Sequence, residues 1–186
     1  MSTILIETGL TGAIGTGIVL VEAGLAKLRH RELVPGVVAN YRLLPHALVA
    51  PVAALLPIVE LGLGLGLIAS VFTGGDLRLL GLPAAALFVV FAGAMAINIR
   101  RGRKAIDCGC GRSQLRQPLA WGLVARNCVL AALVALHALP PPSPGKAVAP
   151  VDIALALVAG TAVFLIFLLF NALAALAASP LASGRR

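Results

Sequence analysis

Long runs of hydrophobic residues, separated by short polar stretches, constrain this chain more than any other feature of its sequence. Five runs each approach or exceed the roughly 20 apolar residues that cross a bilayer, and they occupy residues 4–28, 47–72, 79–99, 119–139 and 152–178. Only 12% of the residues are charged, whereas a soluble domain averages roughly 25%. We therefore expect a single all-α integral membrane domain over residues 1–186, with no soluble domain.

The basic residues predict an orientation, because Lys and Arg collect in short cytoplasmic loops. With five spans, twelve of them fall on one side: Lys27, Arg29, Arg31, Arg42, Arg100, Arg101, Arg103, Lys104, Arg112, Arg116, Arg185 and Arg186. Arg78 and Lys146 fall on the other side, and Arg126 lies inside the fourth run. This asymmetry places the N-terminus outside and the C-terminus inside, with the loop at 100–118 toward the cytoplasm. It also explains the net charge of +8 without a nucleic-acid partner.

The N-terminal sequence MSTILIETGLTGAIGTG lacks a basic n-region and a clear small-residue cleavage site. Secretory signal peptides carry both features. We therefore expect the first run to remain as an uncleaved span.

Proline and glycine residues set further local expectations. Membrane helices tolerate internal prolines such as Pro51 and Pro57. The run LGLGLGL is expected to be helical, with Gly62 and Gly66 forming a small-residue packing face. The Pro35-Gly36 pair is expected to prevent a helix in the first polar hairpin. Pro118 suits the first turn of the fourth span.

Charged residues that lie within the apolar runs are functional candidates by default, and we single out four of them. They are Glu22, Lys27, Glu60 and Arg126. We expect Glu22 to pair with Lys27, and Arg126, with its neighbour Asn127, to reach Glu60 across the bundle. These pairs either lock helices together or take part in proton or thiol chemistry. The three histidines, His30, His46 and His137, are expected at the membrane interfaces.

The most polar stretch, residues 100–118, contains the motif IDCGCGRS. A disulfide between Cys108 and Cys110 would close a small, strained ring with a relatively oxidising potential. Nearby cations favour the reactive thiolate form of a cysteine, and Arg103, Lys104 and Arg112 are the candidates for this activation. The pattern favours a redox-active pair.

Two other interpretations of these cysteines remain open. The pair can be two inert thiols in a tight turn, or two ligands of a metal site to which Cys128 adds a third. A closed zinc site needs four ligands, and no histidine lies nearby in the sequence, so no metal is predicted. Cys128 is either a small apolar residue in the helix or a resolving thiol for the pair.

Five motifs, read in order, resemble the MauE family of methylamine utilisation proteins, within the wider DoxX-like membrane group. They are EAGLAKL, YRLLP, LPIVELGLGLGL, INIRRGRKAIDCGCG and ARN, and the resemblance covers about residues 10–135. The DCGCG motif with a downstream ARN is the part specific to MauE. The resemblance implies a DoxX-like helical bundle with four core spans and a fifth C-terminal span.

The resemblance also implies a role in maturation. MauE-like proteins act with the thioredoxin-like protein MauD to form the disulfide-rich small subunit of periplasmic methylamine dehydrogenase. By this likeness, Cys108 and Cys110 relay electrons or disulfides to such a partner, in a bacterial inner membrane. No cofactor motif is recognisable, and quinone sites have no reliable short signature.

The expected cytoplasmic position of the cysteine loop conflicts with a periplasmic client, because disulfides form in oxidising compartments. Three resolutions remain open: the loop folds into the bundle, electrons cross the membrane, or the basic residues serve the thiols and the orientation is reversed. Two other functions also remain open. One is a non-catalytic scaffold or chaperone for the same maturation, and the other is a small-molecule transporter using Glu22 and Glu60, although no inverted repeat is visible.

Overall fold

The computed structural model describes residues 3–73, 75–106, 108, 118–139 and 148–177. All the regular elements in these ranges are helical, which confirms the all-α fold class. They are α1 (Thr3–Arg29), α2 (Val34–Asn40), α3 (His46–Thr73), the 3₁₀ turn η1 (Gly75–Leu80), α4 (Gly81–Arg100), α5 (Trp121–His137) and α6 (Pro150–Ala177).

Four of these segments are long and apolar enough to cross a membrane: α1, α3, α4 together with η1, and α6. Helix α5 is also apolar, but it has only 17 residues, a length of about 26 Å at 1.5 Å per residue. Large apolar side chains such as Val158 and Ile166 of α6 are well exposed. An apolar surface of this kind is stable against lipid, so the chain is an integral membrane protein of the multi-pass helical type.

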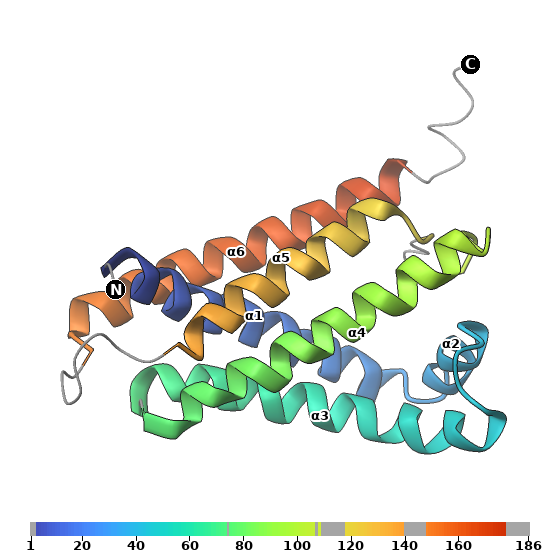
Figure 1. Ribbon diagram of the computed structural model, residues 1–186, viewed down its shortest axis with the longest axis horizontal. Helices are drawn as coiled ribbons and strands as arrows, with labels where there is room; N and C mark the ends of the chain where they lie inside the picture. The colour runs from blue at the N-terminus through green and yellow to red at the C-terminus, as the bar shows by residue number, and fades with distance from the viewer. Residues whose placement is uncertain (1–2, 74, 107, 109–117, 140–147, 178–186) are drawn as a thin grey trace.

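Helix α1 lies at the centre of the bundle and contacts α3, α5 and α6 (Figure 1). Helix α4 packs along α5, and the short α2 packs against α3 at one end of the molecule. The long helices alternate in direction along the chain, so that α1 and α6 run the same way (Figure 1). We call the end that carries α2 and the C-terminus of α4 the α2 end.

Glycines allow α1 and α3 to approach closely. A Cβ atom on Gly64 would lie 2.7 Å from the carbonyl oxygen of Gly17, too close for any larger residue. The predicted packing face of Gly62 and Gly66 is wrong: a Cβ on Gly62 would meet nothing within 4 Å, and one on Gly66 would meet Leu80 of η1. Two residues along a helix turn the side chain by about 200°, so Gly62 and Gly64 face opposite ways.

The prediction of a helix break at Pro35-Gly36 is also wrong, because both residues lie within α2. Pro35 occupies the first turn of α2, where the missing N–H costs nothing. The helix is short, and Val34 is buried at its start. It therefore forms against α3 rather than as an independent helix.

Pro118 does not open the fourth long helix, since α5 begins at Trp121. The N–H of Leu119 donates to the carbonyl oxygen of Lys104 at 2.9 Å, and Ala120 is extended with φ −139° and ψ 152°. The backbone before α5 is thus tied to the segment that follows α4, and the helix starts only after that connection.

His137, which is expected at a membrane interface, is the last residue of α5 and is buried within the protein. It is 8% exposed, and its Nε2 lies 2.7 Å from the hydroxyl of Ser70 on α3. His30 and His46 are exposed. The buried Ser70–His137 hydrogen bond links α3 to the end of α5, a long-range contact that helical periodicity does not reveal.

Candidate functional site

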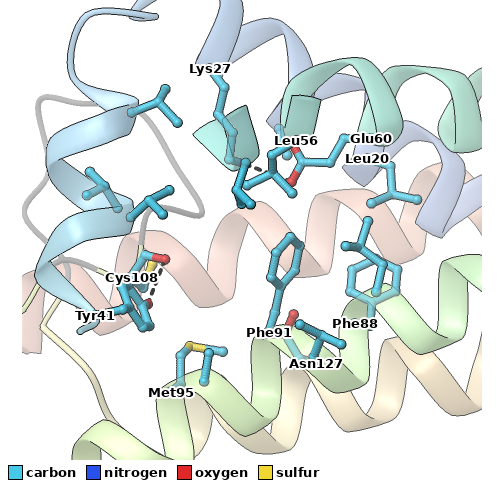
Figure 2. A pocket seen from close by; sticks show the side chains of 18 of the residues that line it. Leu20, Lys27, Tyr41, Leu56, Glu60, Phe88, Phe91, Met95, Cys108 and Asn127 are labelled. Carbon is cyan, nitrogen blue, oxygen red and sulfur yellow. Dashed lines mark hydrogen bonds and ion pairs between the residues drawn. The ribbon is translucent and has the colours of Figure 1, made fainter. Parts of the chain in front are cut away.

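A pocket of about 420 Å³ opens among five helices of the bundle (Figure 2). Its walls come from α1, α2, α3, α4 and α5, with Phe167 added from α6 and Cys108 from the segment after α4. Most of the lining side chains are aliphatic or aromatic. Six carry a polar group or a thiol: Lys27, Tyr41, Glu60, Cys108, Arg126 and Asn127. The pocket therefore brings together four of the candidate residues singled out from the sequence: Lys27, Glu60, Cys108 and Arg126.

An ion pair crosses this pocket between α1 and α3. The Nζ of Lys27 donates to Oε1 of Glu60 at 2.8 Å, and the side chain of Glu60 is fully buried. Lys27 also lies 5.9 Å from the centroid of the Phe91 ring, a favourable cation–π distance. The predicted pairing of Lys27 with Glu22 is wrong. Both lie on α1, five residues apart, which puts them on different faces of the helix.

Arg126 contacts α6. Its guanidinium donates to Oδ1 of Asn171 and lies 4.6 Å from the centroid of Phe167. The sequence predicts that Arg126 reaches Glu60, but the Glu60 carboxylate pairs with Lys27. The neighbouring Asn127 is 1% exposed, and its amide donates to the carbonyl oxygen of Leu123 at 2.8 Å. Arg126 and Glu60 nevertheless line the same pocket.

Cys108 is 7% exposed and packs in an apolar cluster with Met95, Ile99, Leu119 and Leu123. Its carbonyl oxygen accepts a hydrogen bond of 3.1 Å from the Tyr41 hydroxyl (Figure 2). The segment after α4 is thereby held against the end of α2, with Cys108 in the pocket wall.

The other predicted thiols are placed differently. Cys110 lies outside the described residues, as does Arg112. Cys128 is exposed on α5, next to the buried Asn127, and it is not among the residues that line the pocket. Within the described part of the chain, no three His, Cys, Asp or Glu side chains gather as metal ligands.

Arg103 binds the end of α2. Its Nη2 donates to the carbonyl oxygen of Asn40 at 2.7 Å, and its Nη1 donates to Oδ1 of Asn98 at 3.0 Å and to the carbonyl oxygen of Tyr41 at 3.4 Å. The last carbonyls of a helix lack partners within it, so Arg103 satisfies the end of α2. Lys104 is exposed. Thiol activation by Arg103 and Lys104 stays a prediction.

Sequence reasoning did not single out Asn98. It is fully buried, and its amide donates to the carbonyl oxygens of Tyr41 and Ala94, each at 3.1 Å. An interface position suits a tyrosine such as Tyr41, but the sequence did not indicate its hydrogen bond to Cys108. The sequence did contain a signal for Asn98, because it is an asparagine in the last turns of an otherwise apolar run. A buried amide needs hydrogen-bond partners. We call Tyr41, Asn98 and Arg103 the latch.

The fold and the pocket define a class: a multi-pass helical membrane protein with an apolar pocket that holds a buried ion pair and a cysteine. A family model described as Methylamine utilisation protein MauE matches residues 5–140. The chain belongs to this family and therefore to the proteins of methylamine utilisation.

Curated relatives agree with this assignment. The methylamine utilization protein MauE of Paracoccus denitrificans is 42% identical over 168 residues, covering 89% of this chain and 87% of the relative. The MauE protein of Methylorubrum extorquens is 42% identical over 152 residues, covering 81% and 78%. That of Methylophilus methylotrophus is 45% identical over 117 residues, covering 62% and 57%. No solved structure matches the chain.

Proposed function

We propose that this protein is a membrane thiol–disulfide exchange factor that uses Cys108 and Cys110 to mature a periplasmic enzyme of methylamine utilisation. The client is the disulfide-rich small subunit of methylamine dehydrogenase, and the soluble partner is the thioredoxin-like protein MauD. The protein acts in the bacterial inner membrane, with its N-terminus outside and its C-terminus inside.

The position of Cys108 is the observation that carries this proposal. Its backbone carbonyl is anchored by Tyr41, and its residue forms part of a pocket wall rather than of the lipid-exposed surface. An incidental cysteine in a turn needs no such anchor. Thiol–disulfide exchange requires a cysteine held where a second sulfur can reach it, and Cys110 follows two residues later.

The extent of the pocket is also relevant to the side of the membrane on which the cysteines exchange electrons. Cys108 and Tyr41 lie at the α2 end, which the basic residues assign to the cytoplasm. Glu60 lies fourteen residues after the start of α3 and thirteen before its end, so the same pocket reaches the middle of the bundle. This extent favours the resolution in which the cysteine segment is folded into the bundle.

Serine variants test the proposal in cells that express the dehydrogenase. Cys108→Ser and Cys110→Ser should each reduce the yield of disulfide-complete small subunit at least about tenfold, because either change removes the exchanging pair. The measurement is the thiol content of the secreted subunit after alkylation, with immunoblotting to verify that each variant inserts normally.

The scaffold alternative predicts the opposite outcome: a cysteine-free protein would still mature the client and would co-purify with MauD. Normal maturation in both serine variants contradicts the redox proposal. Cys128→Ser addresses the third cysteine separately. Full maturation means that the pair acts alone, whereas loss assigns Cys128 as the resolving thiol.

A further inference from the structure

The pocket has the size and chemistry of a site for an apolar small molecule with a compact polar head. Its volume of about 420 Å³ lies within the range of known ligand sites, roughly 300–1,000 Å³. Seventeen of its 23 lining residues are apolar, and its polar groups are few and specific. Such a site selects a ligand that partitions into the bilayer. We propose that the pocket binds a lipid-soluble quinone, which accepts the electrons of the proposed cysteine pair.

The buried ion pair supplies the contact for the head group. The Lys27 ammonium has three N–H groups, and one of them is directed at Glu60. A quinone carbonyl is a neutral acceptor that suits another of these donors. Glu60 already neutralises Lys27 and would repel a second carboxylate. The ion pair therefore offers no net positive charge to a fatty-acid carboxylate, and the other cation of the pocket, Arg126, is already engaged by Asn171 and Phe167.

The aromatic and aliphatic walls suit the ring and the tail. Phe91 lies beside Lys27, so a ring whose carbonyl meets Lys27 can stack on it. Leu56 and Phe88 continue the apolar wall (Figure 2). Cys108 lines the same pocket, which puts the head-group site and the reactive sulfur in one cavity.

The proposed reaction is balanced. The thiols of Cys108 and Cys110 lose two electrons and two protons as their S–S bond forms, and the quinone takes up both to become the quinol. The resulting disulfide is then available to the thioredoxin-like partner. This step rests on the proposed function, whereas quinone binding by the pocket does not require the cysteines.

A binding experiment on the full-length protein in lipid nanodiscs tests the site, with decylubiquinone as the probe and titration calorimetry as the measurement. Ala94→Phe places a ring into the pocket from α4 and should weaken binding about tenfold or more. Val89→Phe is the matched control, because Val89 lies on the same helix, is exposed and does not line the pocket. It should bind within about twofold of the wild type.

A second variant removes the head-group contact. Replacing only one member of a buried pair strands the other charge, whereas replacing both by apolar residues is often tolerated. Lys27→Met/Glu60→Met should therefore insert and fold but bind decylubiquinone about tenfold less tightly. Absence of wild-type binding, equal binding by Ala94→Phe, or displacement of the quinone by equimolar oleate each overturns the site.

The cysteine variants separate this inference from the proposed function. The wild type, reduced beforehand, should convert decylubiquinone to the quinol under anaerobic conditions, whereas Cys110→Ser, which leaves the pocket-lining Cys108 in place, should not. Quinone binding without quinol formation by the reduced wild type overturns the electron-accepting role. Client maturation that needs both cysteines, in a protein that binds no quinone, overturns this inference and leaves the proposed function standing.

Discussion

Arg103 illustrates how single residues hold the site. It was singled out as a cation near the thiols, but its guanidinium is occupied by Asn98 and by the carbonyls that end α2. Tyr41 then joins this cluster to Cys108 through its hydroxyl. The latch thus connects three segments that are far apart in the sequence, and its geometry positions the Cys108 backbone.

Removing the Arg103 contacts should destabilise the α2 end. Arg103→Gln should lower the free energy of unfolding by about 1–2 kcal/mol, because it removes charge-assisted hydrogen bonds at a partly exposed site. Lys104→Gln is the control, since the neighbouring Lys104 side chain is exposed, and it should change stability by less than about 0.5 kcal/mol. Thermal unfolding in detergent measures both, and an equal effect of the two substitutions contradicts the latch.

At the scale of helices, close packing around α1 determines which faces meet. Gly17 and Gly64 bring α1 and α3 within backbone contact. That approach allows Lys27 of α1 to reach Glu60 of α3. In lipid, small residues at an interface provide van der Waals contact that the hydrophobic effect does not supply. The site therefore depends on this helix pair.

Two glycines of α3 that are two residues apart, Gly62 and Gly64, give a matched test of this interface. Gly64→Ala adds a methyl group 2.7 Å from the backbone of α1 and should lower the free energy of unfolding by about 1–3 kcal/mol. Gly62→Ala points into open space and should be neutral or stabilise the helix by up to about 1 kcal/mol. Unfolding curves of the two purified variants compare them directly, and destabilisation by Gly62→Ala would contradict the assigned packing face.

For the molecule as a whole, the feature that bears on membrane topology is that α1 and α6 run in the same direction (Figure 1). With the shorter α5 counted as a crossing, as the sequence predicts, five crossings would put the two ends of the chain on opposite sides of the membrane. We propose that the α2 end, with basic residues that include Arg29 and Arg100, faces the cytoplasm.

Labelling with a membrane-impermeant maleimide tests this orientation in a background without native cysteines. Asp76→Cys, in the exposed η1 turn, should be labelled from the periplasm, and Ala105→Cys, exposed after α4, should be labelled only after the inner membrane is opened. Both positions are exposed, so accessibility of the side chain does not bias the comparison. Labelling in the reverse pattern would invert the topology.

The sequence by itself determined the fold class and the family, and it identified the charged residues that line the pocket. Apolar runs of bilayer length leave few alternatives to helices, since every backbone polar group must be satisfied within the segment. Charged residues in such runs, such as Lys27, Glu60 and Arg126, can be recognised from the sequence as functional candidates. Burying a charge in a membrane is costly, so such residues are rare there. The DCGCG motif is continuous in the chain and is readable for that reason.

Only the tertiary structure decided which of these residues meet. Helix rotation and close approach of α1 and α3 paired Lys27 with Glu60 rather than with Glu22. Helix α2 formed with Pro35 in its first turn, and it packs against α3. The pocket is assembled from lining residues between Val19 and Phe167, so no local pattern encodes it. Its walls exist only after long-range packing has brought the helices together.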